Sequence, residues 1–465
     1  MPPSFVLSFK KNISVIEQLK KYTGSFSPGL QTAIGILCEA GDTEKKLADL
    51  VLEKDGFPGL TKFHYYLKQF ITLGLICHTI YIDEIPLIQV IPYGENYKFQ
   101  FKNPNPDKKY VLSRFAYLHG DKEQIIIESP LSHSQIILND WRTVVIIHEL
   151  ARPQYSSEIS GNIPGLPEEI TQIFLGILLS NKAILELEAY CQNQEENEAL
   201  NHWEFHDLLF HSRSRTGRHD TPSGKNNRFL GKIKPTNAIK KSLYDEQINL
   251  YQPELENLKQ IDSPFTFILE ERKSLRSYAN KPISARQLGE FLYRSVRVKE
   301  VFIKENMEYS NRPYPSGGAS YELEFYTLIN NCEDVPPGLY HYCPINHQLG
   351  KICELNIPVI RLLKEAEMAT GEECNPQVLI VITARFARVM WSYQSIAYAL
   401  ILKHVGIVMQ TMYLVATGMN LAPCALGGGN SDLFALATGI DYYAESSVGE
   451  FILGSKKIDE QDYQH

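Results

Sequence analysis

Residues 272–276 read RKSLR, and two glycine-containing stretches follow later in the chain, RPYPSGGA at 312–319 and APCALGGG at 422–429. The first stretch places three cations and a hydroxyl within five residues, enough to hold one phosphate and a second anionic group. In the other two, glycine has no side chain, so the backbone can approach a flat ligand closely. Each stretch alone also fits a solvated face or a turn. Together they predict a site for a flat, phosphate-bearing ligand.

The composition is that of a globular protein with several domains. The chain has 465 residues, too many for one ordinary core, so we expect two to four domains. Its hydrophobic fraction of 44% and charged fraction of 22% are ordinary. The net charge of −8 argues against bulk binding of nucleic acid, although a local basic groove stays open.

Cysteine spacing and the distribution of apolar residues indicate in which cellular compartment the protein is expected. Eight cysteines occur and no pair has C-x-x-C spacing, which favours free thiols in a reducing cytoplasm and predicts no metal site. The N-terminus lacks the layout of a signal peptide. The most apolar stretch, 405–422, is interrupted by polar residues and predicts a buried helix, so we expect a cytoplasmic protein without a membrane span.

Residues 1–102 predict a small helical unit closed by a hairpin. Residues 30–40 suit a first helix, Gly41 ends it, and Asp42 or Thr43 can cap a second. Helical spacing marks a third through Phe63, Tyr66, Leu67, Phe70 and Ile71. Residues 75–90 then alternate like strands. Three helices and a hairpin are the winged-helix order, but the third helix is not conspicuously basic, as DNA binding would require.

Residues 103–195 predict a second unit of similar kind. Strands are expected at 115–118 and 124–128 around a turn at His119-Gly120-Asp121, with another after Ser132. Helices are expected at 141–150 and after Pro167, which near the first helical position costs no hydrogen bond. Two successive units of this kind suggest a duplicated architecture.

The remaining chain predicts a connection and a larger domain. Residues 196–258 read as a helix leading into a long extended segment; its His206, Asp207 and His211 have the wrong spacing for a metal site on one helix. Residues 259–465 alternate strands at 322–329, 338–343, 378–384 and 451–453 with helices at 284–293 and 392–417. The fold class is therefore α+β.

The three quoted stretches resemble the flavin-binding elements of the nitroreductase-like FMN oxidoreductases. The resemblance implies FMN as cofactor, with Arg272 and Ser274 on phosphate and ribityl, and Arg276 near N1 and O2 of the ring. Lys273 and Gln410 are weaker candidates for cofactor contact. A cation near N1 would stabilise the charge of the reduced ring.

The glycine stretches complete this resemblance. Leu426, Gly427 and Gly428 match the segment whose backbone N–H reaches flavin N5, a role that falls to Gly427. Pro315, Ser316, Gly317 and Gly318 match the loop that lies against the flavin of a partner subunit. The resemblance therefore implies a homodimer with composite active sites.

A narrower resemblance covers most of the chain from residue 103 onward. WEFHDLLFHSRSRTGR at 203–218, RPYPSGGA and the paired N-terminal units resemble the SagB-type azoline dehydrogenases, among them the thiazoline oxidases of cyanobactin-like pathways. This implies two winged-helix-like peptide-clasp units, 1–102 and 103–195, before a connection at 196–258 and a nitroreductase-like FMN domain at 259–465. The implied substrate is a precursor peptide whose azolines a cyclodehydratase has formed.

The implied reaction removes the Cα proton of the ring and passes a hydride to flavin N5. The family often has Lys-Tyr where this chain has Ser392-Tyr393. A serine without an activating partner has too high a pKa to replace lysine, so Tyr393 is the first candidate for the base. Lys403 and His404 are the others, with a satisfied polar role favoured for His404. The precursor peptide, its ring type and its leader dependence stay open.

Two other functions compete with azoline oxidation. One is a nitro or quinone reductase that uses NAD(P)H, but such an enzyme has no need for the long N-terminal extension. The other is a non-catalytic peptide-binding scaffold, which the absence of lysine at 392 favours and the set Arg272, Ser274, Arg276 and Gly427 opposes.

Overall fold

The fold was taken from a computed structural model. It describes residues 4–10, 26–82, 84–93, 97, 100–187, 195, 198–222, 224–241, 244–372 and 375–457. The chain forms two compact units, Met1–Thr221 and Pro222–His465. The division falls inside the predicted connection 196–258, and Cys191 and Cys374 lie outside the described residues.

The first half of the N-terminal unit is a winged helix. Its elements are β1 (Ser4–Phe9), α2 (Pro28–Glu39), β2 (Asp42–Thr43), α3 (Glu44–Thr72), β3 (Ile76–Ile82) and β4 (Ile85–Pro92). The Thr43 side chain accepts a hydrogen bond from the Lys46 N–H and so caps α3, as predicted. α3 holds two helices joined across Gly56, whose φ of 66° is non-helical and which Pro58 follows. The three predicted helices are therefore confirmed.

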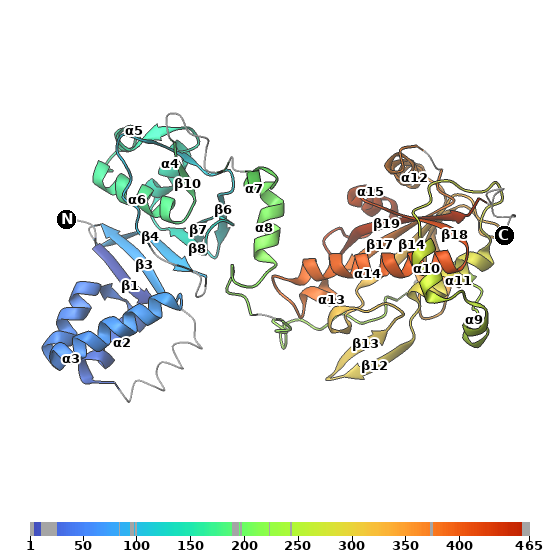
Figure 1. Ribbon diagram of the computed structural model, residues 1–465, viewed down its shortest axis with the longest axis horizontal. Coiled ribbons are helices and arrows are strands. Elements are labelled where there is room, and N and C mark those ends of the chain that lie inside the picture. Colours follow the sequence, from blue (N-terminus) through green and yellow to red (C-terminus); the bar gives the residue numbers. More distant parts are fainter. Residues whose placement is uncertain are drawn as a thin grey trace. The chain divides into compact units, whose positions relative to one another are not determined.

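The same arrangement recurs in the second half of this unit (Figure 1). β1 pairs antiparallel with both β2 and β3, and β5 pairs in the same way with β9 and β10. Helices follow in the same order, α2 and α3 in the first half, and α4, α5 and α6 in the second. The elements are β5 (Lys109–Leu112), α4 (Trp141–Glu149), β9 (Gln154–Tyr155), α5 (Ser156–Asn162), α6 (Glu168–Ser180) and β10 (Ile184–Leu187). The predicted duplication of architecture is present.

Three strands inserted after β5 extend the sheet of the first half, while β5, β9 and β10 form a separate sheet. The inserted strands are β6 (Tyr117–Asp121), β7 (Gln124–Glu128) and β8 (Ser134–Leu138), and β8 pairs with β4. The turn predicted at 119–121 is wrong, because β6 continues through Asp121. The turn is made by Lys122 and Glu123, whose φ angles of 45° and 68° suit a two-residue hairpin.

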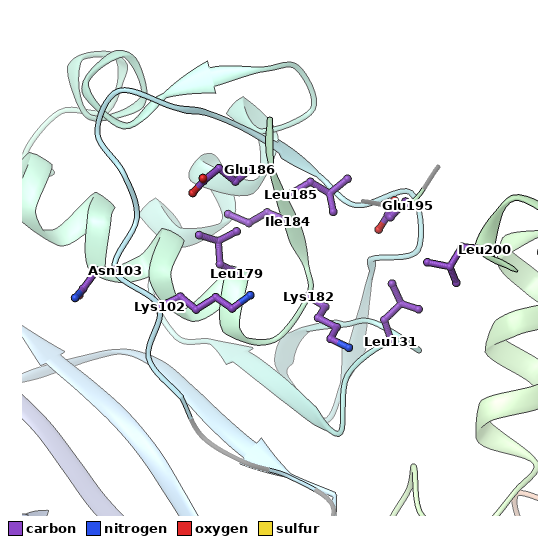
Figure 2. Close-up of a pocket in the computed structure, with 10 residues that line it drawn as sticks. All are labelled: Lys102, Asn103, Leu131, Leu179, Lys182, Ile184, Leu185, Glu186, Glu195 and Leu200. Atoms are coloured by element: carbon purple, nitrogen blue, oxygen red, sulfur yellow. The ribbon is translucent and has the colours of Figure 1, made fainter. Parts of the chain in front are cut away.

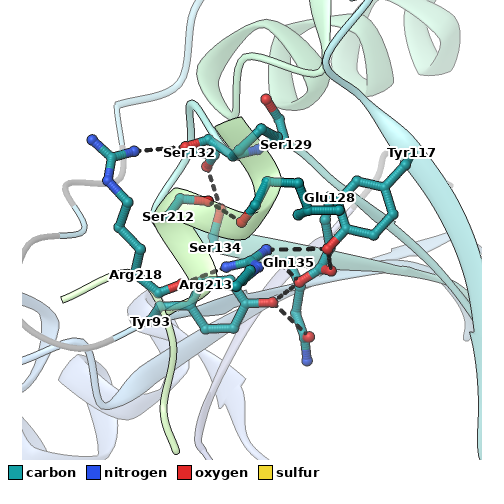
Figure 3. A network of polar contacts seen from close by, with 12 residues as sticks. Tyr93, Tyr117, Glu128, Ser129, Ser132, Ser134, Gln135, Ser212, Arg213 and Arg218 are labelled. Carbon is teal, nitrogen blue, oxygen red and sulfur yellow. Dashed lines mark hydrogen bonds and ion pairs between the residues drawn. The ribbon is translucent and has the colours of Figure 1, made fainter. Parts of the chain in front are cut away.

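A polar network fixes the 203–218 stretch to the first unit (Figure 3). α8 (Phe205–Arg213), which follows the short α7 (Glu198–Asn201), ends at Arg213, whose guanidinium donates to the buried Glu128 at 2.9 Å. The hydroxyls of Tyr93 and Tyr117 donate to the same carboxylate. Burial raises the pKa of Glu128, and Arg213 opposes that rise. Since so many donors converge on one carboxylate, this stretch is structurally part of the N-terminal unit.

The second unit is a three-layer sandwich (Figure 1). A seven-stranded antiparallel sheet has the order β11-β16-β15-β14-β17-β19-β18. α11 and α14 cover one face, and α12 and α15 cover the other, each over its own apolar cluster. The strands are β11 (Gln247–Asn249), β14 (Leu323–Ile329), β15 (Gly338–Cys343), β16 (Gln348–Cys353), β17 (Val378–Arg385), β18 (Leu421–Leu426) and β19 (Glu445–Ser455).

The helices of this unit place the candidate site. They are α9 (Leu255–Ile261), α10 (Phe265–Glu271), α11 (Ala285–Val296), α12 (Ile357–Ala369), α13 (Phe386–Met390), α14 (Ala397–Gly418) and α15 (Ser431–Thr438). A hairpin of β12 (Glu300–Lys304) and β13 (Met307–Asn311) projects from the sheet. Among the described residues α14 is the one helix long and apolar enough to span a membrane. It packs one face on the central sheet as a core helix does.

The helix predicted from Ser392 begins five residues later. α13 ends at Met390, and α14 starts at Ala397. The Ser392 carbonyl accepts from the backbone N–H of Asn226 at 2.8 Å, and thus from another segment of the chain. The prediction of one helix from 392 was wrong because apolar periodicity does not register such a tertiary hydrogen bond.

Candidate active site

Tyr413 on α14 contacts both the RKSLR stretch at 272–276 and the APCALGGG stretch at 422–429. Its hydroxyl lies 2.7 Å from Ser274 Oγ and accepts from the Ala425 N–H at 2.8 Å. The Arg272 guanidinium carbon lies 5.3 Å from the centre of the Tyr413 ring. The Leu275 N–H also donates to the Pro423 carbonyl at 2.8 Å. Residues 272–276 therefore lie along β18, and the exposed Lys273 and Arg276 are free to meet an anion.

The third stretch ends β18 and borders a cavity. Gly427 and Gly428 face space, since no other described atom lies within 4 Å of a Cβ built on either. A cavity of about 430 Å³ is lined by Leu426 to Gly429 together with residues of α14 and β19. A second cavity, of about 210 Å³, shares Leu426, Gly428 and Gly429. Backbone at this corner is open to a flat ligand, which is what the sequence led us to expect of Gly427.

Glu450 is a buried carboxylate at this corner, and sequence reasoning missed it. It lies on β19, is 8% exposed and lines both cavities. A Cβ on Gly429 would overlap its carboxylate, so any other residue at 429 would force the Glu450 side chain to shift. Burial raises the pKa of Glu450, against a hydrogen bond from Ser447. The available signal was an acidic residue inside the apolar stretch VGEFIL at 448–453.

His404 holds the second stretch in place. The Gly317 N–H donates to His404 Nε2 at 2.7 Å, and His404 Nδ1 lies 2.7 Å from the Glu322 carboxylate. Because Nε2 accepts, the hydrogen sits on Nδ1 and points to Glu322. Both ring nitrogens are thus engaged, which matches the satisfied polar role favoured for this residue. Glu322, fully buried, is another functional residue that sequence reasoning missed.

Tyr393 lies against the same loop. Its hydroxyl would lie 2.5 Å from a Cβ on Gly318, a residue with φ 63°. The Tyr393 ring packs on the edge of the main core of the unit and is partly exposed. Ser392 is buried and its carbonyl is held by Asn226. The structure therefore brings Tyr393, Gly317, Gly318 and His404 together, whereas Lys403 and Gln410 lie on the exposed side of α14.

The two halves of the site sit at different points along α14. Ser274 meets the helix at Tyr413, and Gly317 meets it at His404. Nine residues of α-helix span about 14 Å at 1.5 Å per residue. The cation stretch and the RPYPSGGA loop of one chain are therefore separated. Between their contact points on α14, Val405, Gly406 and Met409 line the cavity beside Gly427.

A further cavity lies in the first unit (Figure 2). Its volume is about 580 Å³, and Leu131, Leu179 and Ile184 form part of an apolar wall. Lys102 and Lys182 bring two ammonium groups to it. No group of His, Cys, Asp and Glu side chains suited to a metal ion occurs among the described residues.

Comparison with protein families gives three matches in chain order. The ThcOx helix-turn-helix domain matches residues 1–101, cyanobactin oxidase ThcOx matches 110–220, and the nitroreductase family matches 269–455. Together they cover most of the chain. The chain therefore resembles the cyanobactin oxidases over 1–101 and 110–220 and the nitroreductase family over 269–455. The expected family, the mixed helix-and-sheet fold and the oxidoreductase class are thereby confirmed.

Individual relatives agree with this family. A nitroreductase of Methanocaldococcus jannaschii is 25% identical over 185 residues, which are 39% of this chain and 85% of that protein. The microcin B17-processing protein McbC of Escherichia coli is 26% identical over 178 residues, 37% of this chain; the match spans 62% of McbC, less than two thirds of its length. A chain of the E. coli microcin synthetase McbBCD complex with truncated pro-MccB17 bound has a TM-score of 0.35 and 18% identity, covering 54% of this chain and 91% of that one.

Proposed function

We propose that this cyanobactin-oxidase relative dehydrogenates thiazoline or oxazoline rings of a ribosomally made, modified peptide, using FMN. The observation that carries the proposal is the meeting of Arg272, Ser274 and the 422–429 stretch at Tyr413, beside open glycine backbone. The match to cyanobactin oxidase supports the azoline substrate. The McbC likeness points the same way.

The residues present fit FMN. Arg272, Lys273 and Arg276 offer cations for a phosphate, and Arg can form paired hydrogen bonds with it. Gly427 and Gly428 leave room for a flat ring, as a side chain there would fill the space the cofactor needs. When bound, FMN supplies a hydride acceptor at N5. Gln410, exposed one helical turn from Gly406, stays a candidate contact.

Among the residues of this chain, Tyr393 in its phenolate form is proposed to take the Cα proton of the azoline and so become the neutral phenol. Its hydroxyl is near the 315–318 loop, which His404 and Glu322 hold rigid. His404 offers no free nitrogen, and Lys403 is exposed on α14 with no contact to the 315–318 loop among the described residues. Ser392 is tied through its own carbonyl and is proposed to position Tyr393. Loss of one proton and one hydride converts the azoline to the aromatic azole.

A homodimer with composite sites is part of the proposal. One chain holds the cation stretch and the RPYPSGGA loop apart along α14, so a two-fold partner is needed to bring such halves together. Apolar side chains that a partner could cover are exposed on α10 and α14: Phe265, Phe267, Leu402 and Ile407. Sedimentation at micromolar concentration tests this; a fully active, flavin-loaded monomer contradicts it.

The N-terminal unit is proposed to clasp the precursor peptide in the cytoplasm, after a cyclodehydratase has acted. The duplicated winged helices and the cavity of Figure 2, whose lining combines apolar walls with two lysines and two glutamates, suit an extended peptide. The microcin synthetase complex, which was solved with a truncated pro-peptide, supports this kind of partner.

The direct test is incubation of the purified protein with a thiazoline-containing peptide, followed by mass spectrometry for the loss of two hydrogens. A yellow protein that oxidises the ring without NAD(P)H supports azoline oxidation. A protein that leaves the ring unchanged but consumes NAD(P)H with quinones or nitro compounds is instead the reductase alternative, which the nitroreductase relatives favour.

Flavin binding is tested separately with Arg272→Ala. Loss of a charge-assisted contact costs about 1.5–3 kcal/mol, a ten- to hundredfold loss of FMN affinity. Lys281→Ala, an exposed lysine in the same unit, is the control and should keep its flavin. Equal flavin occupancy of Arg272→Ala and the control in dilute solution contradicts the assignment.

A further inference from the structure

Residues 224–240, here called the strap, run beside the candidate site and are held there mainly through their backbone. Side chains and backbone of β17, α13 and the loop after it hold this segment at 2.6–2.8 Å. Trp391 Nε1 donates to the Ile233 carbonyl, and the Arg388 guanidinium donates to the Thr236 carbonyl. The Arg385 guanidinium donates to the carbonyls of Asn237 and Ala238. In the opposite direction, the Asn226 N–H of the strap donates to the Ser392 carbonyl. These contacts use main-chain atoms of the strap, and the side chains of Lys225 and Lys240 anchor its two ends on Tyr309 and Glu445. The side chains between Arg228 and Lys234 are left for another task.

The strap is strongly basic in an acidic protein. Residues 224–240 contain five lysines and arginines and no aspartate or glutamate, whereas the whole chain carries a net charge of −8. Lys225, Arg228, Lys232 and Lys234 are exposed. The side chains of Lys232 and Lys234 make no hydrogen bond or ion pair with any residue that the structure describes. Between them Ile233 is 55% exposed, and Leu230 is 72% exposed.

The strap borders the candidate base. A narrow cavity is lined on one side by strap residues such as Lys225 and Thr236, and on the other by Gly318 and Ser392. Gly318 is the residue against which the Tyr393 hydroxyl packs. Lys225 Nζ donates to the Tyr309 hydroxyl at 2.9 Å, which fixes one end of the strap over the β12–β13 hairpin.

We propose that the strap binds acidic residues of the precursor peptide next to the azoline, with Lys232, Lys234 and Arg228 as the contacts. This rests on the proposed function, since it names the substrate feature that the same site recognises. Unpaired cations steer and orient an oppositely charged segment. Exposed Ile233 and Leu230 add apolar contact beside the charges, so the segment is acidic with interspersed apolar side chains.

The experiment compares two thiazoline peptides that differ only in the residues flanking the ring, several glutamates in one and glutamines in the other. The test variant is Lys232→Glu/Lys234→Glu. The matched control is Lys259→Glu/Lys281→Glu, which makes the same change of net charge on exposed lysines outside the strap. Flavin content and melting temperature are measured for both variants and should stay at wild-type values.

For the acidic peptide, the strap variant should show a KM raised about tenfold with kcat nearly unchanged, since several exposed ion pairs become repulsions. The wild-type preference for the acidic peptide should fall with added salt. The neutral peptide and the control variant should be unaffected. Equal KM values of wild type and strap variant for the acidic peptide overturn the inference while azoline oxidation stands.

Direct binding separates this inference from the proposed function. Fluorescence anisotropy of the labelled acidic and neutral peptides reports affinity without turnover. If neither peptide is oxidised, the proposed function fails, yet a tenfold weaker affinity of the strap variant for the acidic peptide still supports the strap. If wild type binds anionic vesicles or a DNA oligonucleotide more tightly than the acidic peptide, and the strap variant loses that binding, the peptide assignment is overturned.

Discussion

At the scale of single residues, Tyr393 and Ser392 form an ordered pair for the proposed chemistry. Tyr393→Phe removes the acidic hydroxyl and keeps the ring that packs on the core. Azoline oxidation should fall by roughly two to four orders of magnitude, the usual contribution of general acid–base catalysis. Flavin absorbance should stay, because no cofactor contact is assigned to this hydroxyl. Ser392→Ala should cost far less.

Rates of both variants with one thiazoline peptide, measured by mass spectrometry, decide the matter. A near wild-type rate for Tyr393→Phe would remove Tyr393 from the mechanism. Lys403→Met would then be the next variant, because its ammonium group is exposed on α14 and could approach a substrate held by a partner subunit.

Glu450 should make stability depend on pH. Its folded-state pKa is raised by burial above the ordinary value of 4.5, so the folded protein holds this proton more tightly than the unfolded chain. Its contribution to stability is present below pH 4.5 and is lost as pH rises through the folded-state pKa. Glu450→Gln, which keeps the shape without the charge, should therefore gain melting temperature over wild type as pH rises. A difference that stays constant from pH 4.5 to pH 8 contradicts this; the control is Glu256→Gln, whose side chain is 80% exposed.

Sequence patterns predicted residues that depend on local chemistry and missed those that depend on tertiary contact. The stretches at 272–276 and 422–429 could be predicted because their cations and glycines are clustered within a few consecutive residues. Tyr413 could not be predicted, because its role depends on a hydrogen bond to Ser274, which is 139 residues away in the sequence. Glu322 and Glu324 left a weak signal, two acids in the otherwise apolar SYELEFYTLI at 320–329, which marks buried charges with partners elsewhere.

At the scale of elements, the position of the loop 315–318 depends on its hydrogen bond to the His404 imidazole of α14. His404 accepts from Gly317 and faces the fully buried Glu322. His404→Leu should leave that carboxylate buried without its partner, at a cost of about 3–5 kcal/mol in the free energy of unfolding. Denaturant unfolding measures the loss.

The double variant His404→Leu/Glu322→Leu should recover part of that stability, because the Glu322 carboxylate is then no longer buried without its partner. The double variant should still bind FMN less well than wild type if the loop positions the cofactor, since Gly317 loses its acceptor in both. Strict additivity of the two single changes would show that the pair does not act as a unit.

At the scale of the whole molecule, the order of elements was predictable and the partition of the chain was not. The helix and strand order of 1–102 follows from apolar spacing and from turn residues such as Gly41, which takes a φ of 77°. The four predicted ranges stay a prediction, but the structure groups them into two units that meet at residue 221. The reason is the Arg213–Glu128 contact, which ties α8 to the first unit across 85 residues of sequence.

That contact sets where the chain can be cut. Each unit has apolar clusters of its own, so residues 222–465 should fold without the first unit. The strap would stay intact in this fragment, whereas a fragment from 196 would carry α8 with Arg213 and no Glu128. We expect the 222–465 fragment to be yellow, dimeric and able to oxidise a short thiazoline peptide.

The same fragment should process a full-length precursor poorly, with a higher KM and little change in kcat, because the clasp units hold peptide and not cofactor. The comparison of short and long substrates on fragment and full chain isolates that effect, and flavin content confirms that the oxidase unit is folded. An intact yellow fragment with the full chain's KM for the long precursor would show that residues 1–221 do not recruit substrate. Recognition would then have to lie in the second unit, where the strap supplies the cations for it.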